Sequence, residues 1–153
     1  MSATQVAPEA IAKNLVVKCS PERAFEVFTR EIGSWWPMRS HLRQEIVAVV
    51  VEERVDGRVF ERLSDGSEDD WGSVLVWEPP SRFAMSWYAG PDATRTELEV
   101  RFSADEQGTR VELEHHGWHV LGAGAEASRR AHDRGWDDVL RYYERHVNER
   151  RER

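Results

Sequence analysis

Residues 95–116 read RTELEVRFSADEQGTRVELEHH, and this stretch carries the clearest structural pattern in the chain. Apolar and charged residues alternate in its first part, and the same alternation returns after the turn residues at 105–108. An alternation of period two is typical of a strand with one buried and one solvated face, and so short a link is typical of a hairpin. The inward positions are Leu98, Val100, Phe102, Val111, Leu113 and His115.

The same period extends towards the N-terminus as far as residue 44. Glycine, proline and aspartate interrupt it with links of hairpin length rather than of helical crossovers, so neighbouring strands are expected to pair antiparallel. The expected strands lie near residues 44–51, 57–63, 70–77, 82–88, 95–103 and 109–116, with one more at 11–19. Together they predict a seven-stranded antiparallel sheet.

Two segments have the period of a helix instead. The first begins at Ser20-Pro21-Glu22, because serine can accept from an orphan backbone N–H, proline suits the first turn and glutamate faces the positive end of the helix dipole. Its apolar residues are Phe25, Phe28, Ile32 and Trp35, and Gly33 with Pro37 closes it. The second is a long helix near 125–148. Its apolar stripe is Trp136, Val139, Leu140, Tyr143 and Val147.

Gly135 stands inside the long helix, and residues 117–124 before this helix form a glycine-rich link. A glycine in a helix interior costs about 1 kcal/mol relative to alanine. A kink, or a close approach to the sheet beside Trp136, is therefore expected at Gly135.

Composition limits the classes of protein to consider. The 153 residues predict one domain over 11–148, with loose termini at 1–10 and 149–153. A net charge of −7 disfavours nucleic acid as a partner, because a nucleic-acid surface needs clustered positive charge. The single cysteine, Cys19, and the absence of a signal-like start favour a cytoplasmic protein, and no apolar run is long enough for a membrane span.

The order strand, helix, six strands and long helix carries several short motifs in sequence. They are Ser20-Pro21-Glu22-Arg23-Ala24-Phe25, Trp35-Trp36-Pro37, Trp71-Gly72, Trp77-Glu78-Pro79-Pro80-Ser81-Arg82-Phe83, Trp87 and Gly135-Trp136. This arrangement resembles the SRPBCC superfamily over about 11–147, and within it the homologues of the activator of heat-shock-protein ATPase. The resemblance implies an α+β helix-grip (START-like, Bet v-like) fold, in which the sheet wraps round the long helix and leaves an apolar cavity.

Seven tryptophans are spread over almost every expected element. They could form the aromatic wall of a ligand site, or they could simply fill a wide core with their indole N–H groups bonded to backbone. The apolar residues expected to bind a ligand are Trp36, Trp71, Trp87, Trp118, Leu121, Trp136, Leu140 and Tyr143.

Two polar residues fall in phase with apolar neighbours and complete the expected ligand site. Glu61 shares strand parity with Val59 and Leu63, and a buried carboxylate must find a partner or rise in pKa. The alternative for Glu61 is a solvated position at a sheet edge. His115 could donate to a ligand or to Glu61, or it could be a satisfied structural histidine. Strand parity separates His115 from its neighbouring histidine, and the spacing matches no zinc pattern, so neither a metal nor another cofactor is expected.

Three functions are compatible with these residues. The first is binding of a small hydrophobic or aromatic molecule in the cavity. The second is a cavity-based cyclase or hydrolase that uses Glu61 and His115 as acid and base. The third, implied by the resemblance alone, is a module that stimulates a chaperone ATPase. The sequence leaves the oligomeric state and the identity of the ligand open.

Overall fold

The computed structural model describes residues 9–37, 46–88 and 95–149. The strands are β1 (Ile11–Val17), β2 (Ile46–Val51), β3 (Arg58–Leu63), β4 (Glu68–Glu78), β5 (Arg82–Tyr88), β6 (Arg95–Asp105) and β7 (Gly108–His116). The helices are α1 (Pro21–Phe28), α2 (Ile32–Trp35), the 3₁₀ helix η1 (Trp118–Gly124) and α3 (Ala125–Glu149).

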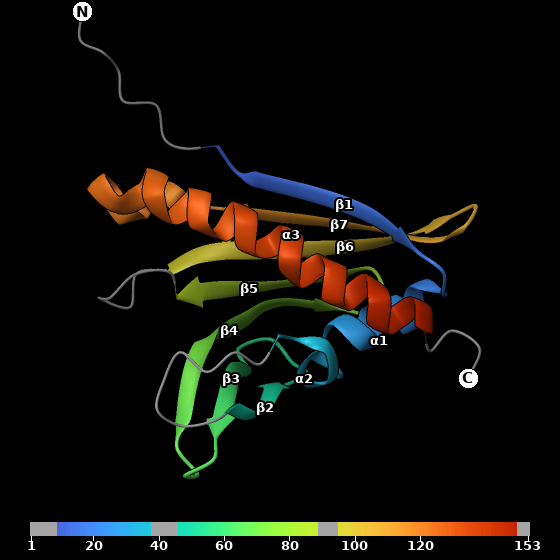
Figure 1. Ribbon diagram of the computed structural model, residues 1–153, viewed down its shortest axis with the longest axis horizontal. Helices are drawn as coiled ribbons and strands as arrows, with labels where there is room; N and C mark the ends of the chain where they lie inside the picture. Colours follow the sequence, from blue (N-terminus) through green and yellow to red (C-terminus); the bar gives the residue numbers. More distant parts are fainter. Residues whose placement is uncertain (1–8, 38–45, 89–94, 150–153) are drawn as a thin grey trace, which may run out of the picture.

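The strands form one antiparallel sheet in the order β1-β7-β6-β5-β4-β3-β2. Strands β2 to β7 follow one another as hairpins, and β1 closes the series by pairing with β7. Figure 1 shows α3 lying across one face of the sheet, with its C-terminal end beside α1. The predicted seven-stranded sheet and α+β helix-grip arrangement are confirmed.

The stripe predicted for α3 is buried along its whole length. Trp136, Val139, Leu140, Tyr143 and Val147 are each at most 9% exposed. The Tyr143 hydroxyl donates to the backbone carbonyl of Ala24 at 2.8 Å and so fastens α3 to α1. On the other side of α3, Lys13 of β1 forms ion pairs with two aspartates of the helix.

The single helix predicted from Pro21 to Trp35 is wrong, because the chain breaks between α1 and α2. The Glu31 N–H reaches back to the Glu26 carbonyl, which leaves the Val27 carbonyl without its usual helical donor. The Trp35 indole N–H fills this vacancy at 2.7 Å. The break therefore turns Trp35 back onto α1, where its ring packs against Phe28.

Gly135 also differs from the expectation of a kink or a close approach. It is exposed in the middle of α3, and a Cβ built on it would meet no atom within 4 Å. Gly72 of β4 is the glycine that does require its missing side chain, because a Cβ there would lie 1.7 Å from the Ser86 carbonyl oxygen of β5. Within the described ranges, no helix combines the length and apolar character needed to cross a bilayer.

Candidate functional site

Four tryptophans from four parts of the fold meet between the sheet and α3. Trp36 follows α2, Trp71 lies in β4, Trp87 in β5 and Trp136 in α3, and we call these residues the tryptophan cluster. The ring centroids of Trp36 and Trp71 are 4.7 Å apart, and those of Trp71 and Trp87 are 5.6 Å apart. Trp136 completes the cluster at 5.3 Å from Trp87 and 6.0 Å from Trp36.

The strands place two of these rings by different means. Trp87 continues the inward alternation of β5, in register with Thr96 of β6. Trp71 lies at an irregularity between β3 and β4, where the partner changes from Gly72 to Asp70 between successive residues of β3. Trp136 is 3% exposed, whereas Trp36, Trp71 and Trp87 are half-buried. The cluster therefore has a buried end at α3 and a partly open end formed by the other three rings.

Glu61 of β3 is buried, with 8% of its surface exposed, as strand parity predicted. Burial raises the pKa of its carboxyl group, and so do the hydrogen bond and the charge of Asp69, its partner in β4, while a hydrogen bond with the Trp71 side chain acts in the opposite direction. This bond brings a carboxyl group to the edge of the tryptophan cluster. Phe60 is buried as well, although on the other face, because the guanidinium group of Arg58 covers its ring at 4.1 Å.

His115 of β7 is fully buried, and protein groups engage both of its ring nitrogens. The Trp136 indole donates to Nδ1 at 3.0 Å, so the imidazole proton is on Nε2, which lies 2.6 Å from the Thr96 hydroxyl oxygen. Burial, together with the nearby His132 and His116, lowers the pKa of His115 to about 3. The side chain is therefore a neutral imidazole with a structural partner at each nitrogen.

His132 of α3 belongs to the same layer, and the sequence analysis missed it. The Trp87 indole donates to its Nε2 at 3.2 Å. Its ring centroid lies 5.3 Å from that of His115 and 5.1 Å from that of Trp118. The available signal was its position one helical turn before Trp136, which places it on the same stripe of α3.

The other expected site residues lie around the tryptophan cluster, and all but Leu121 are deeply packed. Trp118 is 1% exposed, and its indole N–H donates to the His115 carbonyl at 2.9 Å. Tyr143 contacts Phe28 and Trp35, away from Trp87, and Leu140 is also buried. Leu121 is half-buried against the core. The structure thus brings Trp118 and His115 to the cluster and places Leu140 and Tyr143 in the surrounding core.

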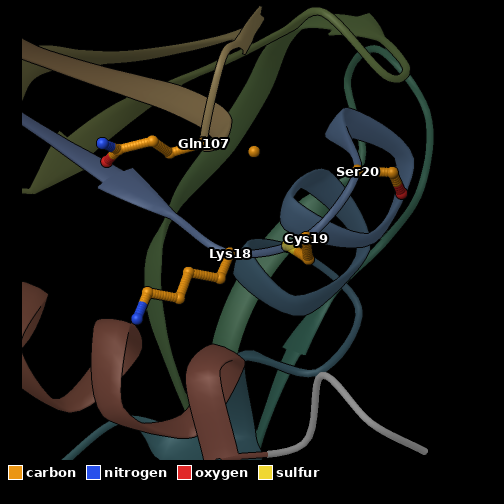
Figure 2. Close-up of a pocket in the computed structure, with 5 residues that line it drawn as sticks. Lys18, Cys19, Ser20 and Gln107 are labelled. Atoms are coloured by element: carbon orange, nitrogen blue, oxygen red, sulfur yellow. The ribbon is translucent and has the colours of Figure 1, made fainter.

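A surface hollow of about 660 Å³ lies at the end of β1, and no residue of the tryptophan cluster lines it. Its labelled side chains include Lys18, Cys19 and Gln107, and Figure 2 shows them pointing in different directions rather than into one space. Burial raises the pKa of the Cys19 thiol to about 11, so this cysteine is a poor nucleophile. In the part of the chain that the structure describes, no three histidine, cysteine or acidic side chains gather as a metal site.

A second hollow, of about 270 Å³, lies between α1 and the turn that joins β4 to β5. Phe25, Trp77 and two prolines line it together with the charged side chains of Glu22, Glu26, Arg30 and Glu53. Arg30 bonds to both Glu26 and Glu53, which neutralises part of this rim. The hollow is separate from the tryptophan cluster, because Trp77 packs against Phe25 and Phe83.

Comparisons with known proteins identify the family. The model of the family described as Activator of Hsp90 ATPase homolog 1-like protein matches residues 18–147. An anthrahydroquino-gamma-pyrone synthase, Txn09, whose structure was solved as a complex, is 38% identical, with 83% of this chain and 88% of that chain covered and a TM-score of 0.57.

More distant solved structures share the fold alone. A Chromobacterium violaceum protein is 17% identical, with 92% of this chain and 99% of that chain covered and a TM-score of 0.68. An AHSA1-like protein from Aeromonas hydrophila is 20% identical, with 90% and 91% covered and a TM-score of 0.64. None of the curated proteins compared with the chain matches it. The family match over most of the sequence confirms the resemblance drawn from its motifs, and the chain belongs to the Activator of Hsp90 ATPase homolog 1-like family.

Proposed function

We propose that the protein binds a flat aromatic molecule against the tryptophan cluster. The observation that carries this proposal is the meeting of Trp36, Trp71 and Trp87, three half-buried indoles from different elements whose ring centroids are 4.7 to 6.2 Å apart. Indoles present large apolar faces and gain about 0.5–1.5 kcal/mol per ring contact beyond the area they bury. A planar ligand would exploit several such faces at once.

Glu61 would give this site its polar contact. Its carboxyl group lies beside Trp71, at the partly open end of the cluster, and burial and the neighbouring Asp69 raise its pKa above the ordinary value. A protonated carboxyl can donate to a carbonyl or phenolic oxygen, whereas a carboxylate can only accept. The proposed ligand is therefore a flat aromatic molecule that carries oxygen substituents.

A second candidate function is ring closure on such a molecule. The identity of 38% with a protein named as an anthrahydroquino-gamma-pyrone synthase favours it. In this reading the cluster holds the aromatic part of the substrate in a reactive shape, and Glu61 acts as the acid. His115 would stabilise the site rather than transfer protons, because both of its nitrogens bond to protein groups.

Binding of alizarin, a planar hydroxylated anthraquinone, tests the first proposal by quenching of tryptophan fluorescence and by calorimetry. Trp71→Leu should weaken binding about tenfold, which corresponds to a loss of about 1.4 kcal/mol. Trp77→Leu is the matched control, because Trp77 is a half-buried tryptophan of the same strand that packs against Phe25 and Phe83 instead. Equal affinities of the two variants, or no binding by the wild-type protein, would overturn the proposal.

A further variant, Glu61→Gln, separates a binding protein from an enzyme. Incubation with an anthrahydroquinone that carries a 1,3-diketone side chain next to a ring hydroxyl, followed by mass spectrometry and ultraviolet absorption, would reveal ring closure, in which the hydroxyl oxygen adds to the distal ketone and one water is lost. An enzyme should form a product, and Glu61→Gln should suppress its formation much more strongly than it weakens alizarin binding. If the substrate binds tightly but is not converted, only the binding function is supported.

A further inference from the structure

We infer that His132 is a positioning residue, whose imidazole holds the indole of Trp87 so that its ring faces the ligand site. The inference rests on the proposed function, because it concerns the orientation of a ring in the tryptophan cluster. His132 lies on α3, whereas Trp87 lies in β5 at the middle of the sheet. The bond between them therefore joins the long helix to the centre of the proposed site.

The hydrogen-bond geometry fixes the role of each atom. Nδ1 of His132 lies 2.8 Å from the Ser128 carbonyl oxygen, which can only accept, so Nδ1 carries the proton. Nε2 then has a free lone pair, and the Trp87 indole donates to it at 3.2 Å. The backbone of α3 thus selects the tautomer that accepts from tryptophan.

Neighbouring rings restrict the imidazole of His132 on several sides. Its centroid lies 5.1 Å from Trp118 of η1 and 5.3 Å from His115 of β7. The Trp87 ring meets it nearly edge-on, at an interplanar angle of 81°. An acceptor held in this way defines a direction for the indole N–H and not only a distance.

Trp87 is central to the cluster, because it contacts each of the other three rings, Trp36, Trp71 and Trp136. The same kind of hydrogen bond is formed by two neighbouring tryptophans. The Trp136 indole donates to His115, and the Trp71 side chain bonds to Glu61. Each of these indoles directs its polar edge to a protein acceptor. The ring faces are left for contacts with one another and with a ligand.

Two substitutions of similar length test this role. Glutamine at position 132 can accept a hydrogen bond at about the reach of Nε2, whereas methionine fills similar space with only a weak acceptor. His132→Met should weaken alizarin binding about tenfold and shift the Trp87 indole cross-peak in a proton–nitrogen correlation spectrum. His132→Gln should bind within about threefold of the wild type and keep the cross-peak near its wild-type position. Trp87→Phe assigns the cross-peak, and thermal unfolding of each variant verifies that it is folded.

Two results would overturn the inference. One is wild-type affinity in His132→Met, and the other is an equal loss in both variants, which indicates a packing role without a hydrogen bond. The spectrum also separates this inference from the proposed function. If wild-type protein does not bind alizarin but His132→Met alone moves the Trp87 cross-peak, the proposed function fails and the positioning of Trp87 by His132 stands.

Discussion

Replacing His115 with asparagine should remove much of the protein's sensitivity to acid, because this imidazole is buried in a form that cannot take a proton without losing a hydrogen bond. A proton could bind only at Nδ1, which accepts the Trp136 indole at 3.0 Å. Protonation would break that bond and leave a charge in a site with no exposed surface. His115 therefore takes up a proton much more readily in the unfolded chain.

The sign and size of the effect follow from the pKa values. In the folded protein the pKa of His115 is lowered from 6.5 to about 3, so the unfolded state binds more protons between these values. Its contribution to stability is complete above pH 6.5 and is lost as the pH falls towards 3. At pH 5 the loss should be about 2 kcal/mol, because each unit between the pH and the unfolded-state pKa contributes about 1.4 kcal/mol.

Urea unfolding at pH 7.5 and pH 5 measures this contribution in the wild type and in His115→Asn. The variant should be less stable at pH 7.5 but should lose about 2 kcal/mol less than the wild type on acidification. The comparison with the variant is needed because Glu61 also contributes to the pH dependence. Its pKa is raised in the folded protein, so its contribution to stability decreases as the pH rises, which opposes the effect of His115. The same pH slope in both proteins, or an imidazole that titrates near pH 6.5 in the folded state by NMR, would refute the reasoning.

Two other predictions concern the glycines of α3 and β4 and the reactivity of Cys19. Gly135→Ala should stabilise the protein by up to about 1 kcal/mol, since the exposed helical position has room for a methyl group, whereas Gly72→Ala should destabilise it by about 2 kcal/mol through the clash with Ser86. Urea unfolding of both variants checks this, and a stabilised Gly72→Ala would contradict it. Cys19 should react with iodoacetamide at pH 8 about a hundredfold more slowly than a cysteine of pKa 9.0, because its pKa of about 11 leaves little thiolate. A rate that equals that of the urea-unfolded chain would show that burial does not protect it.

The strands and α3 could be predicted because one physical signal dominated each of them. Along β7, and along β6 as far as Phe102, every second side chain is buried, and the alternation in the sequence reports this directly. The break between α1 and α2 could not be predicted in the same way. The break is stabilised by the bond from the Trp35 indole to the Val27 carbonyl, a contact between a side chain and the backbone that leaves the apolar spacing of the segment unchanged.

The site was predictable in part. Strand parity shows which side chains face the interior, but it does not show which hydrogen-bond partners they find there. Parity correctly placed Glu61 and His115 in the interior. Parity could not reveal that His115 would be occupied by Trp136 and Thr96, because these partners come from a distant helix and a neighbouring strand. His132 escaped notice for the opposite reason, since a polar residue near the start of a charged helix gives no signal unless the apolar stripe is extended to include it.

The tryptophans themselves supply a rule that would have found these histidines. An indole has one N–H donor, and a buried or half-buried donor needs an acceptor. Trp71, Trp87 and Trp136 bond to Glu61, His132 and His115 respectively, and each of these acceptors is a polar residue in phase with apolar neighbours. In a chain with many tryptophans, such polar residues are first to be read as indole acceptors. A residue becomes a candidate for chemistry only when it has capacity left after its tryptophan is satisfied. Of these three Glu61 meets that condition best, because two carboxyl oxygens offer more hydrogen-bonding positions than its bonds with Trp71 and Asp69 occupy.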